Sequence, residues 1–362
     1  MKYGLIYDAT TCHITGNYLR DSIPQSQSVR FDMTIFKANA DIEQLLNTMC
    51  ERSTIPDALF HELGAQGLPH GLETVSIPTA ILDIDTFGWT EFRLRWAMLF
   101  DYVFTWHPSY VPRFEEAGHP RVCAIPHAID GRLFAADDRA EPLYDLGFVG
   151  HFGLPQYSKR DRVNSVLGSR FRTNDFRKRY SKEETAEVYK RSKVVVNVAR
   201  AEFPQEANMR CYEAMAGGAL LITEIPTELT EWGFREGEHF IGWHSETEIP
   251  RLVDQFLGDS AGRAAIARAG QERTLADFTY QRCVERIAEF ITRDEGRLLG
   301  PARKWSPEEV HLLYLSYYYR FQMFGEVLEE FSLLRRANPK AYWKGLPMML
   351  KTLRHALKRS LI

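Results

Sequence analysis

Short apolar runs alternate with longer stretches of mixed polar and apolar residues along most of the chain. Each run has the length and the β-branched or aromatic composition typical of a strand. Strands that alternate with helical stretches are typical of parallel sheets built from βαβ units, so the pattern predicts an α/β protein with two doubly wound halves. The predicted strands are Tyr3–Tyr7, Phe31–Phe36, Ala58–Phe60, Thr79–Ile84, Tyr102–Thr105 and Val122–Ile125 in the first half, and Leu146–Val149, Val194–Val198, Leu220–Ile225 and Phe240–Trp243 in the second.

Breaks between these runs predict where the chain divides. A polar join that contains a proline lies at Ala135–Pro142, and Gly296, Gly300 and Pro301 interrupt the chain before an aromatic-rich helical region. The chain has 362 residues, more than one core usually holds. We therefore expect a Rossmann-like domain over residues 1–138, a second over 139–298 and a helical tail over 299–362.

Composition excludes several classes of protein. A net charge of -3 and 26% charged residues argue against binding to nucleic acid. Five scattered cysteines, an odd number without a CxxC pair, cannot complete a disulfide framework and fit a reducing cytoplasm. No apolar window approaches the roughly 18 to 20 residues that a membrane-spanning helix needs. We expect a cytoplasmic protein that is soluble or peripheral to the inner face of a membrane.

The segment 193–224 carries the clearest candidate site. Two β-branched runs, each suited to a strand buried on both faces, flank a polar loop and a short helix that a Gly-Gly pair at Gly217 ends. Asn208 is a suitable N-cap, so free N–H groups of the first turn would face a ligand beyond the first strand. Arg210 and Glu213 share one helix face. We expect Arg210 to contact a phosphate and Glu213 to accept hydrogen bonds from ribose hydroxyls.

At these residues the chain resembles a known family. The run RCYEAMAGGALLIT, which begins at Arg210, is similar to the nucleotide-sugar signature of GT-B glycosyltransferases. Its form is closest to the CgeB-like, spore-maturation-type branch of the family-4-like group. The resemblance covers roughly residues 60 to 290. Three further runs occur in the order and at about the spacing that the family shows: Ile125–Asp130, Asp145–Gly150 and Ala267–Thr274.

The resemblance implies a GT-B fold, in which two Rossmann-like domains face a cleft and hold the acceptor and the donor. It implies transfer of a sugar from a nucleotide diphosphate sugar to a hydroxyl of a glycan, a lipid-linked glycan or a protein. It also implies retention of anomeric configuration, with no protein-bound metal and no tightly bound cofactor. The wider family has a Glu eight residues before the helix Glu. Here that position is Gln205, and the neighbouring Glu206 becomes the candidate beside the donor sugar.

The same departure leaves a second reading open. A non-catalytic binding or scaffold protein could keep the fold without the family's acid, and Gln205 favours that alternative. Binding of nucleoside diphosphates would separate the two readings, because only an intact donor site is stabilised by such ligands.

Further candidates for the diphosphate lie after the first strand of the second half. A turn at Gly150 would let backbone amides approach a diphosphate, which Lys159 and Arg160 at the start of the next helix would also contact. The alternative is a plain tight turn beside a solvated basic helix.

Two candidates concern the acceptor. Asp85 ends a strand, where it could orient or deprotonate the acceptor hydroxyl or simply cap the next helix. Asp83-Ile-Asp85 resembles the metal-chelating DxD of another glycosyltransferase fold, but no other signature of that fold accompanies it, and we expect no metal there. His127, near the domain crossover, is a catalytic candidate or a structural histidine.

The segment Lys340–Ile362 holds six Lys or Arg and no acid. On a helical projection its apolar residues cluster and its basic residues flank or oppose them, as in helices that lie in an anionic membrane interface. The alternative is a terminal helix whose apolar face packs against the protein itself. The segment therefore predicts a basic amphipathic helix with a possible membrane surface as its partner.

Overall fold

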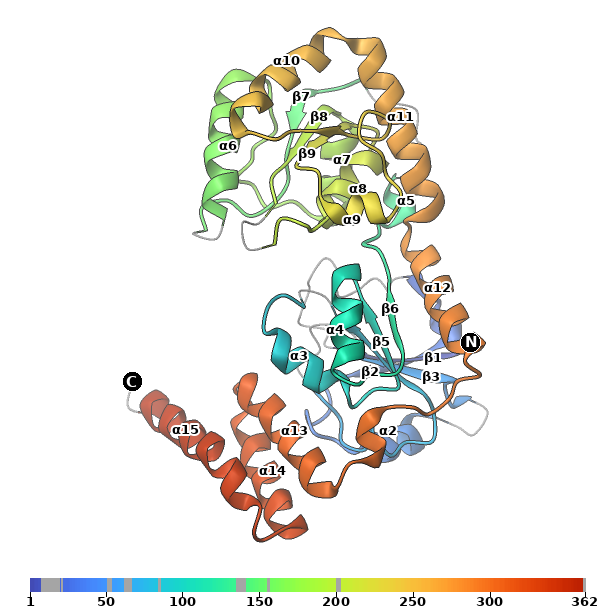
Figure 1. Ribbon diagram of the computed structural model, residues 1–362, viewed down its shortest axis with the longest axis vertical. Coiled ribbons are helices and arrows are strands. Elements are labelled where there is room, and N and C mark those ends of the chain that lie inside the picture. The colour runs from blue at the N-terminus through green and yellow to red at the C-terminus, as the bar shows by residue number, and fades with distance from the viewer. Residues whose placement is uncertain are drawn as a thin grey trace. The chain divides into compact units, whose positions relative to one another are not determined.

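The computed structural model describes residues 1–7, 20, 22–50, 54–61, 67–83, 86–134, 141–154, 157–199 and 203–360, with side chains up to residue 354 at the C-terminal end. The chain divides into two compact units, which are coloured by residue number in Figure 1. Met1–Ala124 and Ile287–Ile362 together form the first unit, and Ile125–Arg286 forms the second. The domain limits at residues 138 and 298 stay a prediction.

A parallel six-stranded sheet forms the centre of the first unit. Its strands, in spatial order, are β2 (Ser28–Asp32), β1 (Tyr3–Tyr7), β3 (Ala58–His61), β4 (Thr79–Asp83), β5 (Tyr102–Thr105) and β6 (Val122–Ala124). Helices α2 (Ile42–Met49), α3 (Thr90–Ala97) and α4 (Val111–Glu116) connect strands along the chain. Every residue of β3, β4 and β5 is buried, as expected for central strands that are covered on both faces.

A parallel four-stranded sheet forms the centre of the second unit. Its order is β10 (Ile241–Gly242), β9 (Leu220–Thr223), β8 (Ser192–Asn197) and β7 (Tyr144–Gly147). The helices of this unit are α5 (Gly131–Phe134), α6 (Ser158–Arg170), α7 (Lys182–Lys190), α8 (Met209–Ala216), α9 (Thr227–Glu231), α10 (Ile249–Gly258) and α11 (Ser260–Asp277), and α12 (Tyr280–Arg293) leads back into the first unit.

Both faces of the second sheet are covered by helices. Val194 and Val196 of β8 pack into a core that includes side chains of α6 and α10, whereas Val195 between them packs into a core with α7 and α8. Because successive side chains of a strand point to opposite faces, one apolar run supplies both cores. Ligands of such sheets bind beyond the carboxyl ends of the strands.

The structure has a strand at each of the ten predicted places, and the predicted parallel α/β class is confirmed. The limits predicted for the second strand, Phe31–Phe36, were wrong, because β2 ends at Asp32. The Asp32 carboxylate accepts hydrogen bonds from the N–H of Thr34 at 3.0 Å and from its hydroxyl at 2.8 Å. An Asp that bonds to the residue two positions on forms a turn, and this turn ends the strand.

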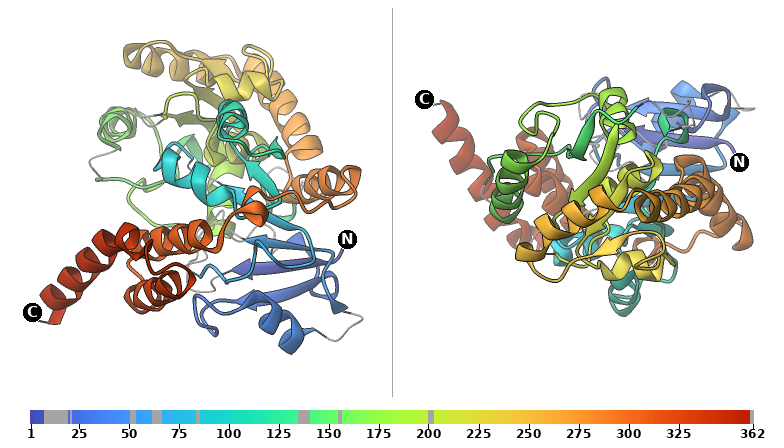
Figure 2. Two further views of the ribbon diagram at one scale, coloured as in Figure 1. Left: turned by 60° about the horizontal axis from the view of Figure 1, so that its bottom comes forward. Right: turned by 90° about the horizontal axis from the view of Figure 1, so that it is seen from above.

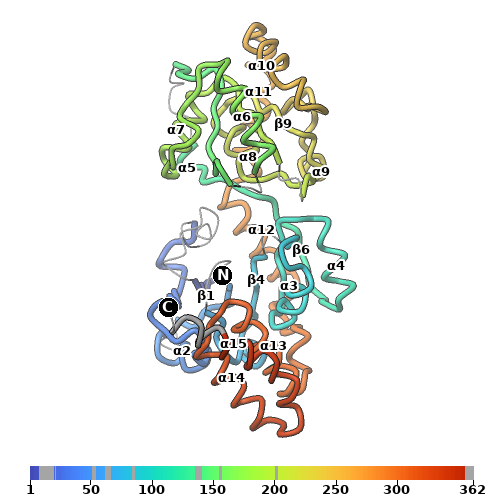
Figure 3. Tube along the Cα trace, turned by 90° about the vertical axis from the view of Figure 1, so that its left-hand side faces the viewer, coloured from blue at the N-terminus to red at the C-terminus, as the bar shows by residue number. Residues whose placement is uncertain are grey.

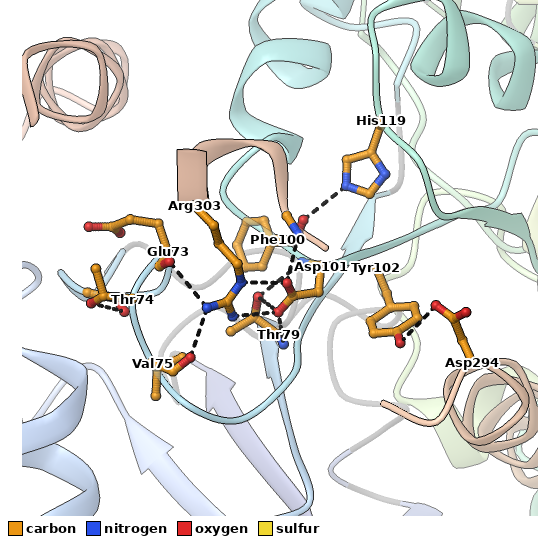
Figure 4. A network of polar contacts seen from close by, with 12 residues as sticks. Glu73, Thr74, Val75, Thr79, Phe100, Asp101, Tyr102, His119, Asp294 and Arg303 are labelled. Atoms are coloured by element: carbon orange, nitrogen blue, oxygen red, sulfur yellow. Dashed lines mark hydrogen bonds and ion pairs between the residues drawn. The ribbon is translucent and has the colours of Figure 1, made fainter. Parts of the chain in front are cut away.

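A buried ion pair joins the C-terminal segment to the first sheet (Figure 4). Asp101 is fully buried next to the start of β5, and Arg303 lies in a 3-10 helix over Pro301–Lys304. The guanidinium of Arg303 donates to both carboxylate oxygens of Asp101, at 2.6 and 2.7 Å. The N–H and the hydroxyl of Thr79 and the N–H of Gly300 also donate to this carboxylate. The buried charge therefore has a full set of partners.

Three helices complete the first unit: α13 (Pro307–Arg320), α14 (Phe324–Ala337) and α15 (Tyr342–Ser360). Figures 2 and 3 show them side by side, and all three contact one another. A Cβ at Gly345 would lie 2.6 Å from Leu315, so the glycine lets α15 approach α13 closely. The predicted C-terminal helices are confirmed, and α15 continues through Pro347.

Candidate functional site

The N-terminus of α8 forms as the sequence predicts. Asn208 is the N-cap, and its side-chain oxygen accepts the N–H of Arg210 at 3.2 Å. β8 ends at Asn197 and the helix begins at Met209, so the first turn of α8 follows the carboxyl end of β8 after one loop. A helix N-terminus carries unpaired N–H groups and a partial positive charge, which together favour an anion.

Two glycines permit close approaches around this helix. A Cβ at Gly150 would lie 2.5 Å from a terminal nitrogen of Arg210, so only a glycine gives that guanidinium its place. A Cβ at Gly217 would lie 2.8 Å from the Cβ of Tyr189, so Gly217 lets the end of α8 pack on α7. Gly150 thus borders the candidate site, whereas Gly217 has a packing role.

The Arg210 side chain is held in one orientation. Its Nε donates to the carbonyl of Val149 at 2.9 Å, and one terminal nitrogen donates to the amide oxygen of Asn197 at 2.8 Å. The guanidinium also lies over the ring of Phe148, 4.7 Å from its centroid. These bonds use part of its five N–H donors. The others can bind a phosphate without the entropy cost of ordering the side chain.

Sequence reasoning missed Asn197, which connects the parts of this site. Its side chain is fully buried at the end of β8. The amide nitrogen donates to the hydroxyl of Thr223 at 3.1 Å, while the amide oxygen accepts from Arg210 and, at 3.2 Å, from Asn208. One polar residue inside an otherwise valine-rich run was the signal available in the sequence. A buried amide needs several partners, and these could only be named from the fold.

Glu213 lies one turn further along α8. Burial raises the pKa of its carboxyl to about 7, and Arg210 opposes the shift by favouring the charged form. Within the described residues, the Glu213 side chain makes no hydrogen bond and no ion pair. The residue is half-buried, and a partly desolvated carboxylate without partners is unfavourable, so hydrogen-bond donors of a ligand would satisfy it.

The loop before α8 is held by hydrogen bonds to Glu228 of α9. Glu228 of α9 accepts the N–H of Ala207 at 2.9 Å, and the N–H of Glu228 donates to the carbonyl of Gln205 at 3.3 Å. Between these contacts the Glu206 side chain is buried. Burial, with a smaller contribution from the charge of Glu206, raises the pKa of Cys211 to about 12. Glu206 therefore lies near the start of α8, where the sequence placed it.

His127 also reaches this helix. The imidazole is buried, and its ring centroid lies 6.3 Å from that of Tyr212 in α8. Its nearest chain neighbours, Ala128 and Ile129, are buried as well, and Ile129 packs in the same core as Tyr212. The structure therefore brings His127, Glu206, Arg210 and Glu213 to one helix.

The two basic candidates of α6 are engaged with the protein. Lys159 forms an ion pair with Glu224, whose second carboxylate oxygen accepts the N–H of Ala199 at 2.7 Å. Arg160 is buried, and two of its guanidinium nitrogens donate to the carbonyl of Val198 at 3.3 Å. Both side chains thus support the loop after β8, and their expected contacts with a diphosphate stay a prediction.

Asp85 lies outside the described residues. Its neighbour Asp83 is buried at the end of β4, where it forms an ion pair with Arg93 of α3 and accepts the hydroxyl of Thr86 at 2.5 Å. Burial raises the pKa of Asp83, and the charge of Arg93 lowers it. The first Asp of the DxD-like run therefore serves the protein's own loop. Among the described residues, no group of three or more His, Cys, Asp or Glu side chains could hold a metal ion.

The chain is similar to known proteins in part of its sequence and in its fold. Residues 151–289 match the profile of a family described as glycosyl transferase-like. No curated protein sequence matches the chain. Solved structures of HepE from Anabaena resemble the fold over 81% of this chain. The complex with UDP has a TM-score of 0.58 at 13% identity and covers 81% of this chain and 100% of HepE.

Two further HepE structures have a similar match to this fold. The complex with UDP and glucose has a TM-score of 0.57 at 13% identity, with 81% of this chain and 99% of that chain covered. The complex with UDP-glucose has a TM-score of 0.55 at 14% identity, with 81% and 100% covered. Residues 151–289 therefore form a glycosyl transferase-like domain, and the two parallel sheets match the GT-B fold of glycosyltransferase structures.

Proposed function

We propose that the protein is a retaining, metal-independent glycosyltransferase that takes a sugar from a nucleotide diphosphate sugar. The observation that carries the proposal is the start of α8, where a fixed Arg210 lies one turn before Glu213, whose carboxyl has no hydrogen bond or ion pair among the described residues. An arginine beside a helix N-terminus suits a diphosphate, and an unpartnered carboxylate suits the two hydroxyls of a ribose. HepE, which shares the fold, binds UDP and UDP-glucose.

The chemistry requires stabilisation of charge. The bond between the anomeric carbon and the diphosphate oxygen breaks, and the diphosphate gains negative charge. Arg210 and the N–H groups of α8 stabilise that charge more in the transition state than in the bound donor, which lowers the barrier. Because Val149 and Asn197 already orient the guanidinium, little reorganisation is needed during the reaction.

The acceptor oxygen forms the new bond to the anomeric carbon on the face that the diphosphate leaves, and its proton passes to a base. Asp85 and His127 are our candidates for orienting or deprotonating this hydroxyl, and Glu206 is the candidate beside the donor sugar. Lys159 would assist the diphosphate after exchanging its present partner Glu224, and Arg160, which is buried against the carbonyl of Val198, through its remaining N–H groups.

A donor-hydrolysis screen tests the proposal. UDP-, GDP- and ADP-sugars are incubated with the wild type, with Arg210→Ala and with the control Arg162→Ala, which removes an exposed arginine of α6 paired with Glu246. We expect turnover of at least one donor, a loss of about 100- to 1,000-fold in Arg210→Ala and little change in the control. Absence of turnover and of nucleotide binding with every donor would refute the enzyme.

A non-catalytic scaffold is the competing function. It is favoured by Gln205, which stands where the wider family has an acid, and by the internal pairing of Lys159 with Glu224. Thermal unfolding distinguishes the two, because a ligand at 100 times its dissociation constant stabilises the folded protein by about 2.7 kcal/mol. A scaffold without a donor site would show no shift with UDP, GDP or ADP.

We further propose that the protein works at the cytoplasmic face of a membrane, bound through α15. Gly345 and Thr352 of this helix are buried, whereas Leu350, Leu353 and Arg354 are exposed, so apolar and basic side chains share the outer face. No helix of the described part of the chain is long and apolar enough to span a bilayer. An amphipathic helix of this composition would bind an anionic lipid surface.

Sedimentation with vesicles tests this surface. The full chain should pellet with phosphatidylserine-containing vesicles at low salt and be released as salt rises, because screening weakens surface charge interactions. Leu350→Glu should abolish binding, whereas Leu328→Glu, at an exposed leucine of α14, should not. Equal sedimentation of both variants would rule out α15 as the membrane contact.

A further inference from the structure

An exposed tryptophan stands at the carboxyl end of the first sheet. Trp89 lies in the connection between β4 and α3, six residues beyond the last residue of β4, and 53% of its surface is exposed. This edge of a parallel sheet is where ligands bind. Most large apolar side chains of the unit are buried. The exposed indole at this edge is therefore a candidate contact for a ligand.

The backbone at Trp89 breaks two local preferences at once. Trp89 is the N-cap of α3, a position that favours Ser, Thr, Asn or Asp, and its side chain makes no capping hydrogen bond. Its φ of 67° and ψ of 40° place it in the left-handed region, which bulky residues avoid. Conflicts between local preference and fold concentrate at functional sites.

The loop that carries Trp89 is fixed by buried groups. Arg93 donates to the carbonyl of Gly88 at 2.8 Å and pairs with the buried Asp83, and the hydroxyl of Thr90 donates to the carbonyl of Thr86 at 2.9 Å. The same Thr86 donates its hydroxyl to Asp83. The strand-end aspartate thus contacts residues on both sides of Trp89, Thr86 before it and Arg93 after it.

The C-terminal helices fix the ring itself. The guanidinium of Arg320, the last residue of α13, lies 3.4 Å from the centroid of the indole, and the ring of Phe321 meets it edge-on with centroids 6.4 Å apart. The ring of Phe92 of α3 contacts the ring of Phe321 as well, and α3 and α13 also contact each other directly. One face of the indole is therefore covered by a cation, while 53% of the residue's surface stays exposed for stacking.

We infer that Trp89 is a stacking platform for a pyranose ring of a glycan acceptor. This inference rests on the proposed glycosyl transfer and narrows the acceptor class from any hydroxyl to a sugar. A pyranose presents a face of C–H groups that suits the electron-rich face of an indole. A rigid aromatic surface binds at low entropy cost.

Ligand-detected NMR tests the platform. Saturation transfer from the protein to cellotetraose, maltotetraose and chitotetraose is measured for the wild type, Trp89→Ala, Trp89→Phe and Trp343→Ala. Trp343 is a matched control because 62% of its surface is exposed on α15. We expect ring C–H protons of at least one oligosaccharide to be saturated by the wild type and by Trp343→Ala, and the affinity to fall at least tenfold in Trp89→Ala. Trp89→Phe should restore part of it.

The outcomes separate this inference from the proposed function. No saturation of any oligosaccharide by the wild type, or equal affinities of the wild type and a folded Trp89→Ala, overturns the platform. UDP binding is measured on the same wild-type sample by thermal shift. Sugar binding that depends on Trp89 without UDP binding would leave the platform standing and remove the donor site, and the reverse result would do the opposite.

Discussion

Each unit of the protein contains a carboxyl group whose surroundings differ from those in the other unit: Asp101 is fully buried and Glu213 is half-buried. Asp101 of the first unit accepts five hydrogen bonds, from Thr79, Gly300 and Arg303. Glu213 of the second unit has no side-chain hydrogen bond or ion pair among the described residues, and burial raises the pKa of its carboxyl to about 7.

Position explains the difference. Asp101 precedes β5, at the amino end of the first sheet, where it joins the C-terminal segment to the core. Glu213 stands on the helix that follows the carboxyl end of β8, on the ligand side of such sheets. A buried acid with all its partners contributes to the fold, whereas an acid without them is kept in an unfavourable state that a ligand can relieve.

The largest effect on stability should come from removing the cation that pairs with Asp101. Arg303→Ala leaves the Asp101 charge buried and unpaired, and the free energy of unfolding of the first unit should fall by about 3 to 5 kcal/mol. Calorimetry measures the loss. The control Arg297→Ala removes an exposed arginine that pairs with Glu295 and should change stability by less than about 1 kcal/mol. Similar values for both variants would contradict our description of Asp101.

A second change, Asn197→Asp, adds a negative charge beside Arg210 in the candidate donor site. Asn197→Asp keeps an oxygen for Arg210 and Asn208 but partly neutralises the guanidinium that we assign to the diphosphate. UDP affinity should fall on the order of tenfold, since a like charge near a bound anion is unfavourable. Isothermal titration gives the affinity, and an unchanged value would show that Arg210 does not contact the diphosphate.

The pH dependence of stability sharpens the comparison further. The folded pKa of Glu213 lies above its unfolded value, so the folded state favours the protonated acid. Its contribution to stability is full below about pH 4.5 and is lost as pH rises through about 7. Glu213→Gln should therefore be more stable than the wild type at pH 8, by on the order of 1 kcal/mol, and this gain should shrink toward pH 5.

Urea unfolding at the two pH values measures this difference. The same substitution should weaken UDP binding, because an amide presents one acceptor oxygen where the carboxylate presents two. A variant with lower stability at pH 8, or with undiminished UDP affinity, would mean that the carboxylate serves the fold in the way Asp101 does.

The smallest effect concerns the first unit, where the unfavourable feature is the left-handed backbone conformation of Trp89 rather than a carboxylate. Trp89→Gly and Trp89→Ala remove the same ring, but only glycine adopts a positive φ freely. Trp89→Gly should be the more stable of the two by up to about 1 kcal/mol, as measured by thermal unfolding. The opposite order would show that the loop relaxes out of the left-handed conformation without the ring.

The sequence predicted the scaffold better than the site. Runs such as Val194–Val198 carry their strand signal locally, because burial on both faces needs consecutive β-branched residues. The start of α8 was also local, since an N-cap asparagine acts within its own turn. The end of β2 was missed because a turn formed by the Asp32 side chain overrides the apolar run that follows.

The unforeseen features depend on residues far apart in the chain. Glu224 lies 65 positions from Lys159, and Val198 lies 38 positions from Arg160. Nothing in the basic run at the start of α6 reveals that both side chains already have partners. Trp89 escaped notice for a related reason: an aromatic residue in a loop is ordinary until its φ and the guanidinium over its ring are known.

The ion pair of Asp101 and Arg303 also bears on the order of events during translation. Its partners are 202 residues apart, and the whole of the second unit lies between them. Residues 125–286 emerge as one contiguous stretch and can fold once they leave the ribosome. The first sheet, although made earlier, carries an unpaired buried acid until Arg303 is synthesised. The part of the protein that is made first would therefore reach its final state last.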